Sequence, residues 1–155
     1  MSDTEKLDLQ RYVPAMLTFL ANKLATGASM TYRKRFGIGV VEWRLLALLA
    51  VEDKITANRI CQVIGLDKSA VSRSLQTLEA AGHICGEVDS QDARRYAVSL
   101  TAAGKALHDR VLKVALERER RLLSDFSPEE IDTLLDLLRR MQNKVGYVND
   151  YCPPE

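Results

Sequence analysis

The chain has 155 residues, of which 46% are hydrophobic, so it is long enough for one domain with an oligomerisation element and can bury a core. It carries 22 basic and 21 acidic residues, and its formal net charge of +1 excludes a polybasic, histone-like protein but not a local basic surface. Three cysteines, Cys61, Cys85 and Cys152, are far apart and odd in number. This usage favours a reducing cytoplasm over a disulfide framework.

The N-terminal segment, MSDTEKLDLQRY, is charged and has no apolar core of the kind found in signal peptides. The most apolar run, VVEWRLLALLAVED, is interrupted by Glu42 and Arg44 and is too short to span a bilayer. We therefore expect no membrane partner.

Helical spacing of apolar residues predicts a first helix over 9–35, with Pro14 in its first turn or at a kink. The segment FGIG interrupts the pattern, and a second helix with an apolar interior follows over 41–52. Thr56 begins a short third helix. This helix ends at Gly65, because glycine is common at helix C-termini.

Asp67 predicts the N-cap of a fourth helix, which runs to about Ala81 and ends at Gly82. The segments HICGEV and YAVSL then predict two strands, and the polar loop DSQDARR between them indicates a β-hairpin. Thr101 is the expected cap of a fifth helix, which continues to about Leu123.

Ser127, Pro128 and Glu130 form a strong start signal for a last helix. Its apolar positions are Ile131, Leu134, Leu135, Leu138, Met141 and Val145. The tail YCPPE should be irregular. The sequence thus predicts a mainly α fold with a small β-hairpin wing, in the order of a winged helix-turn-helix. In that arrangement the third helix crosses the DNA backbone and the fourth enters the major groove.

The fourth helix has an apolar face centred on Val71, with Leu75 and Leu78 close to it. Arginine can contact guanine through two hydrogen bonds, glutamine can contact adenine, and serine can contact bases or phosphates. An ordinary solvated amphipathic helix would show the same pattern, and the hairpin that follows favours DNA binding. The polar residues expected on or near the opposite face are Ser69, Ser72, Arg73 and Gln76.

The predicted hairpin loop contains Asp89, Asp92, Arg94 and Arg95 and has no net charge. Arginines at a hairpin tip can enter a narrow minor groove, where the potential is most negative. Asp92 could hold Arg94 or a nearby arginine by a forked ion pair. The alternative is a charged turn that only closes the hairpin.

These segments resemble the MarR-type winged-helix transcriptional regulators. The resemblance runs through EWRLLALL, RICQVIGLDKSAVSRSLQTLEAAG and DSQDARRYAVSLT, and the Asp92-x-Arg94 wing followed by Leu100, Thr101 and Gly104 is its most specific part. It implies that the helix over 67–81 is the recognition helix. The resemblance also implies that Ser69, Ser72, Arg73 and Gln76 face DNA, and that Arg94 is the minor-groove residue with Asp92 as its orienting partner.

By the same resemblance, the protein would be a homodimeric repressor of a pseudo-palindromic operator on double-stranded DNA. A small molecule, often a phenolic or aromatic acid, would release it. The N-terminal dimerisation helix would span 1–35, the DNA-binding lobe 36–100, the C-terminal dimerisation helices 101–148 and a tail 149–155. The family commonly has an arginine at the start of the wing, where this chain has HICGE and Gly86. DNA affinity would then depend more on Lys68, Arg94 and Arg95.

Tyr32, Arg33 and Trp43 lie near the junction where an effector pocket would form. Tyr32 could donate a hydrogen bond, and Arg33 could pair with a carboxylate. The alternative is that Trp43 belongs to the core and that the YRKR segment is a solvated or phosphate-facing helix end.

Other functions have weaker support in the sequence. His83 and Cys85 would share one face of a strand, but His108 lies on another element, so we expect no metal site and no cofactor. A redox-responsive regulator would use Cys85 or Cys152. The sequence contains no nucleophile paired with a base and no glycine-rich phosphate loop, so no motif in it indicates an enzyme. A winged helix that contacts only proteins remains the last alternative.

Overall fold

The computed structural model describes residues 6–154, and the remaining residues, 1–5 and 155, are not described further. The start of the charged N-terminal segment and the last residue of the tail therefore lie outside the described residues. The chain divides into two compact units, with the boundary between Lys113 and Val114. This boundary falls within one helix, α5.

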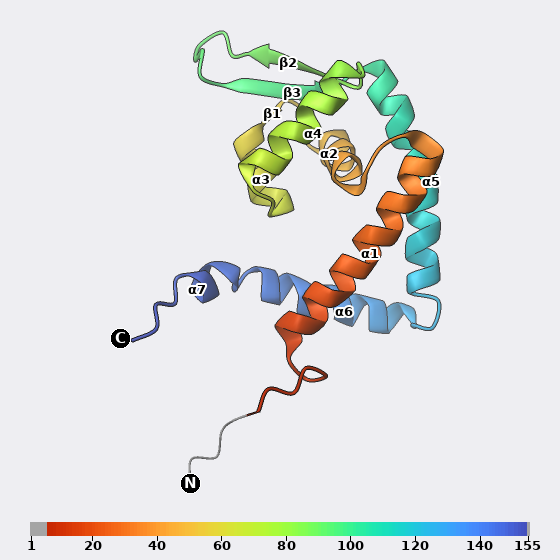
Figure 1. The fold of residues 1–155 in the computed structure, drawn as a ribbon, viewed down its shortest axis with the longest axis vertical. Coiled ribbons are helices and arrows are strands. Elements are labelled where there is room, and N and C mark those ends of the chain that lie inside the picture. The colour runs from red at the N-terminus through yellow and green to blue at the C-terminus, as the bar shows by residue number, and fades with distance from the viewer. Residues whose placement is uncertain (1–5, 155) are drawn as a thin grey trace. The chain divides into compact units, whose positions relative to one another are not determined.

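Helices and strands follow the predicted order, with one added strand, β1, and one added short helix, α7 (Figure 1). The elements of the first unit are α1 (Val13–Phe36), α2 (Val40–Val51), β1 (Ile55–Thr56), α3 (Ala57–Ile64), α4 (Lys68–Ala80), β2 (Ile84–Val88), β3 (Tyr96–Leu100) and the first part of α5 (Ala102–Leu122). The second unit contains the end of α5, α6 (Pro128–Gln142) and α7 (Val145–Asn149).

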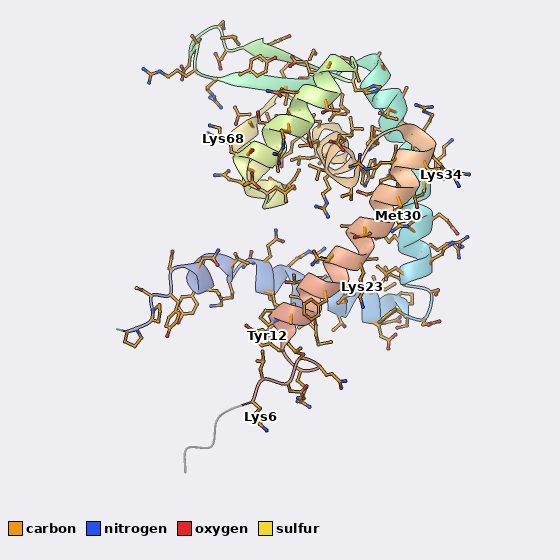
Figure 2. All side chains as sticks on the ribbon, in the orientation of Figure 1. Lys6, Tyr12, Lys23, Met30, Lys34 and Lys68 are labelled. Atoms are coloured by element: carbon orange, nitrogen blue, oxygen red, sulfur yellow. The ribbon has the colours of Figure 1, made fainter. Side chains whose placement is uncertain are left out.

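Helix α1 begins later than the predicted residue 9. The Asp8 side chain accepts a hydrogen bond from the Gln10 N–H at 2.9 Å, and the Asp8 carbonyl accepts from Tyr12. This local turn satisfies the backbone before the helix starts. Pro14 lies in the first turn, as expected. Figure 2 labels Lys23, Met30 and Lys34 along the helix and Tyr12 at the residue just before it.

Local capping fixes the two helices of the helix-turn-helix. The Thr56 hydroxyl accepts a hydrogen bond from the Arg59 N–H at 3.3 Å, and the Asp67 carboxylate accepts one from the Ala70 N–H at 2.9 Å. Gly65 ends α3 with φ +74°, a conformation that favours glycine. The predicted start and end of α3 and the predicted N-cap of α4 are confirmed.

The sheet has the order β1-β3-β2, with antiparallel pairing on both sides of β3. Strands β2 and β3 form the predicted hairpin. Strand β1 was not predicted, because two residues are too few to show the alternation of a strand. Ile55 pairs with Val98, so the chain enters α3 directly from the sheet.

The core of the first unit surrounds α2, which packs against α1, α3, α4 and β3. Leu45 and Leu46 of α2 are fully buried. Burial of apolar surface of this kind is the main term that holds the lobe together. The other fully buried large side chains are Ile60, Val71, Leu78, Leu107 and Val111.

In the second unit, α6 begins with the predicted capping box. The Ser127 N–H donates to the Glu130 carboxylate at 2.8 Å, and the Glu130 N–H donates to the Ser127 hydroxyl at 3.1 Å. The expectation of one helix through Val145 is wrong. The Lys144 N–H bonds to the Met141 carbonyl, three residues earlier, and this tighter turn separates α7 from α6.

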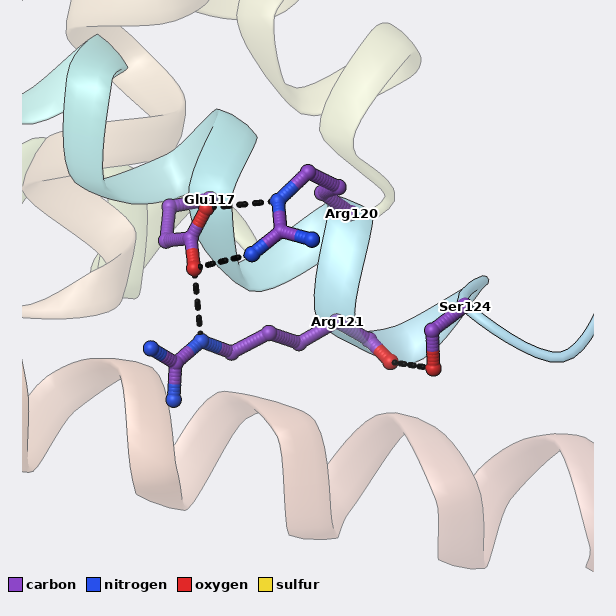
Figure 3. A network of polar contacts seen from close by, with 4 residues as sticks. All are labelled: Glu117, Arg120, Arg121 and Ser124. Carbon is purple, nitrogen blue, oxygen red and sulfur yellow. Dashed lines mark hydrogen bonds and ion pairs between the residues drawn. The ribbon is translucent and has the colours of Figure 1, made fainter.

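The end of α5 carries a network centred on one carboxylate (Figure 3). Glu117 accepts two hydrogen bonds from Arg120, at 2.8 and 2.7 Å, and one from Arg121 at 2.7 Å. The Ser124 hydroxyl donates to the Arg121 carbonyl at 3.0 Å. Hydrogen bonds from Arg120, followed by those from Arg121, lower the pKa of Glu117 to about 2.

Candidate DNA-binding site

Helix α4 separates a polar exposed face from a buried face. Val71, Ser74 and Leu78 are buried, with the helical spacing of three and four residues. Leu75, which the sequence placed on the buried face, is only half-buried. The exposed residues include the predicted DNA-binding residues Lys68, Ser69, Ser72, Arg73 and Gln76, with Lys68 at the start of the helix (Figure 2).

Ser74 holds the site together and was not predicted from the sequence. Its hydroxyl donates to Oε1 of Glu42 at 2.9 Å, and Oε2 of the same carboxylate accepts the Gly39 N–H at 2.8 Å. Glu42 therefore joins α4 to the first turn of α2. The sequence could have indicated this burial, because Ser74 follows Val71 by three residues and so lies near the buried face of the helix.

A recess of about 250 Å³ lies between the end of α1, the start of α2 and α4. Arg33 and Arg73 both line it, together with Ser29, Glu42 and Thr77. A Cβ at Gly39 would meet the Glu42 carboxylate at 2.7 Å and the Arg33 guanidinium at 2.8 Å. A glycine at this position thus leaves room for both charged groups.

The wing tip is organised through its backbone. The Asp92 carboxylate accepts the Arg94 N–H at 3.0 Å, and the Asp92 carbonyl accepts the Arg95 N–H at 2.9 Å. The expected forked ion pair between Asp92 and an arginine is not among the ion pairs of residues 6–154. The Asp92 side chain closes a local turn instead, as aspartates often do. Arg94 and Arg95 are exposed.

The wing also contacts α4 through a side-chain hydrogen bond. The Tyr96 hydroxyl, on β3, donates to Oε1 of Glu79, on α4, at 2.6 Å. This hydrogen bond to a carboxylate raises the pKa of Tyr96. A Cβ at Gly86 would overlap the Tyr96 ring, so the glycine on β2 makes the contact possible. Gly86 lies in the HICGE segment, near the place where the resemblance leads us to expect an arginine.

The base of the wing is tied to the start of α5. The Thr101 hydroxyl donates to the Gly82 carbonyl at 2.6 Å and accepts the Gly104 N–H at 3.1 Å. This confirms the predicted cap. A Cβ at Gly104 would overlap the His83 carbonyl, so the helix approaches the chain before β2 more closely than a larger residue would allow.

The three residues of the predicted effector pocket do not form one group. The Tyr32 ring is buried and meets the Trp43 ring edge-on, with centroids 6.1 Å apart. Trp43 also stacks on His108 at 5.5 Å. Arg33 is exposed and lines the recess beside Glu42 instead. The effector role of these residues remains a prediction.

The cysteines and histidines are dispersed. Within residues 6–154, no group of three or more His, Cys, Asp or Glu side chains could hold a metal ion. Cys61 is half-buried, whereas Cys85 and Cys152 are exposed. In the same part of the chain, no helix is both long enough and apolar enough to cross a bilayer.

Residues 36–95, which include the helix-turn-helix, β2 and the loop of the wing, match the family model described as the MarR family. The HTH-type transcriptional regulator YdgJ of Bacillus subtilis is 31% identical over 115 residues, which cover 72% of this chain and 68% of that protein. The chain belongs to the MarR family. This MarR-family protein has the fold of a transcriptional regulator and not that of an enzyme.

Solved structures agree with this assignment. A MarR/EmrR family transcriptional regulator from Acinetobacter sp. ADP1 is 38% identical, with a TM-score of 0.85 over 91% of this chain and 99% of that one. The S. aureus MepR structure, solved as a DNA complex, has a TM-score of 0.76 at 24% identity, over 89% of this chain and 99% of that one. The second likeness shows the shared fold.

Proposed function

We propose that this MarR-family protein binds a pseudo-palindromic DNA operator as a homodimer. In each half-site, α4 enters the major groove and the wing tip enters the adjacent minor groove. The observation that carries the proposal is the exposed polar face of α4, beside a wing that is joined to that helix by the hydrogen bond from Tyr96 to Glu79.

Individual roles follow from side-chain chemistry. Arg73 and Gln76 are suited to base edges, and Ser69 and Ser72 to bases or phosphates. Lys68 lies at the N-terminus of α4, where its charge and the helix dipole both favour a phosphate. The proposed contacts of the wing tip are made by Arg94 and Arg95, with Asp92 holding the turn.

Exposed apolar side chains near both ends of the chain support a homodimer. No residue of α6 or α7 is buried, and Leu134, Leu135, Leu137 and Leu138 are between 36% and 44% exposed. On α1, the exposed large apolar residues are Val13, Met16, Leu17, Phe19, Leu20, Leu24 and Met30. Surfaces of this kind usually mark an interface. We therefore assign the dimer contacts to 1–35 and 101–148.

Release by a small molecule completes the proposal. The PcaV regulator of Streptomyces coelicolor, 21% identical with a TM-score of 0.73, was solved with its natural ligand. In the present chain, a phenolic or aromatic acid would bind near Tyr32 and Trp43, or near Arg33. As a regulator of DNA, the protein would act in the cytoplasm.

Selection of duplexes from a random-sequence library tests the proposal. The wild-type protein should enrich a sequence with two inverted half-sites, whose centres lie about one helical turn apart. Footprinting of the enriched duplex should show protection with two-fold symmetry. Enrichment of no sequence, or protection without symmetry, would contradict the proposed mode of binding.

A further inference from the structure

We propose that Tyr96, Glu79 and Gly86 form a positioning device, here called the wing lock, which sets the wing relative to α4 and so determines the minor-groove contact. The inference rests on the proposed DNA-binding function. None of the three residues is proposed to contact a base. They act through the arginines of the wing tip.

The lock joins three elements at the outer end of the hairpin. Tyr96 pairs with Val88, the outermost pair between β2 and β3. Gly86 lies two residues before Val88, so it is the diagonal neighbour of Tyr96 on the same face of the sheet. In this position the Tyr96 ring crosses the backbone of Gly86, and its hydroxyl reaches Glu79 in the last turn of α4.

The bond has the properties of a strong but exposed contact. Its length of 2.6 Å and its carboxylate acceptor are typical of a charge-assisted hydrogen bond. Tyr96 remains 45% exposed, so water competes with the bond. The hydrogen bond to the carboxylate raises the pKa of the Tyr96 phenol, so this hydroxyl remains a donor further into the alkaline range than that of an ordinary tyrosine.

The position of the lock connects it with the arginines. Arg95 directly precedes Tyr96 in the chain, and the Arg94 N–H is held by Asp92. At the other end of the hairpin, the His83 N–H bonds to the Leu78 carbonyl at the end of α4. The hairpin is thus attached to α4 at its base and again beside its tip. Loss of the outer attachment would free the tip while leaving α4 unchanged.

Tyr96→Phe tests the lock by removing only the hydroxyl, and Glu79→Gln is the matched control because its amide oxygen still accepts. The probe is the duplex that the wild type enriches from a random library. Tyr96→Phe should bind it about threefold to tenfold more weakly. Hydroxyl-radical protection of the minor groove should decrease, while methylation interference at guanine N7 in the major groove stays unchanged. Glu79→Gln should retain the wild-type footprint.

Gly86→Ala provides a second test through the coupling between two positions. In the wild type, the added methyl group should displace the Tyr96 ring and weaken binding. In a Tyr96→Ala background, which lacks the ring, the same substitution should have little further effect. An equal effect of Gly86→Ala in both backgrounds, or an unchanged minor-groove footprint in Tyr96→Phe, would overturn the proposal.

Failure of the lock can be distinguished from failure of the proposed function. If the wild type enriches no duplex, DNA binding as proposed is wrong. Amide hydrogen exchange then tests the lock without DNA. Tyr96→Phe should accelerate exchange at residues 86–88, and Glu79→Gln should not. Equal exchange in the wild type and in Tyr96→Phe would show that the bond does not hold the wing.

Discussion

Ser74 and Glu42, on two different helices, share a hydrogen bond of 2.9 Å that fixes the buried side of α4. The same carboxylate caps α2 through the Gly39 N–H, so both of its oxygens have partners. Ser74 therefore has a structural role, whereas Ser69 and Ser72 of the same helix are exposed and can contact DNA.

Ser74→Ala should lower the free energy of unfolding by about 1–2 kcal/mol, because it removes a largely buried donor and leaves one oxygen of Glu42 without its protein partner. Denaturant unfolding measures the change. Ser72→Ala is the matched control: it lies in the same helix but is exposed, so its stability should stay within about 0.5 kcal/mol of the wild type. A similar loss of stability in both variants would argue against the division between the two faces.

Arg73→Ala should weaken binding to the selected duplex by about 1–3 kcal/mol and relax the preference at one base pair of each half-site. Competition binding with duplexes substituted at each position measures both effects. Lys68→Ala, which removes a proposed phosphate contact, should weaken binding to all duplexes alike. If the base preference of Arg73→Ala equals that of the wild type, Arg73 does not contact a base.

Arg94→Ala should weaken binding without changing the oligomeric state, because it removes a charge from the proposed minor-groove contact. Titrations at several salt concentrations should also show a shallower salt dependence. Asp92→Asn retains the side-chain oxygen that accepts the Arg94 N–H and should bind nearly as the wild type does, whereas Asp92→Ala should bind more weakly. Unchanged affinity of Arg94→Ala at every salt concentration would exclude the wing contact.

Much of this lobe could be predicted from sequence because its signals are local. Thr56, Gly65 and Asp67 cap helices through bonds to residues a few positions away, and the apolar spacing of α4 identifies its exposed face. The contact of Tyr96 with Glu79 is different. It joins residues far apart in the sequence and requires the space above Gly86, which no local pattern reveals.

The ion pair expected for Asp92 shows a second limit. A sequence can place a carboxylate near arginines, but it does not decide between a guanidinium and a backbone N–H as the donor. In the tight turn of the wing, the N–H of Arg94 is closer in the chain and needs no ordering of a long side chain. The short turn therefore favours the backbone donor.

Glu117 should titrate far below an ordinary glutamate. Its pKa in the folded protein is lowered to about 2 by Arg120 and Arg121. Because this folded-state pKa is depressed, ionised Glu117 stabilises the folded state at pH values above the ordinary pKa near 4.5. This stabilisation is lost as the pH falls toward 2. Carbon-13 NMR of the Glu117 carboxyl group measures the midpoint. The double variant Arg120→Ala/Arg121→Ala should raise it toward 4.5, and Lys113→Ala on the same helix should not.

Paired substitutions on α6 test the homodimer. Leu134→Glu with Leu138→Glu places two charges on one face of the helix, and burial of charges in an apolar interface is unfavourable. Analytical ultracentrifugation should show a dimer for the wild type and a monomer for the double variant. Asp136→Lys, at an exposed position of the same helix whose neighbours one turn away are polar, is the control and should remain a dimer. A wild-type monomer at micromolar concentration would contradict the proposed assembly.

The central strand of the sheet has a consequence for the synthesis of the protein. Strand β1 precedes α3 directly, but its partner β3 lies on the far side of both α4 and β2 in the chain. A nascent chain emerges from its N-terminus, and contacts between distant residues form last. On the ribosome, α3 and α4 are therefore synthesised before β3, the strand that pairs with both β1 and β2. The lobe can bind DNA as proposed only after β3 has left the ribosome and has paired with β1 on one edge and β2 on the other.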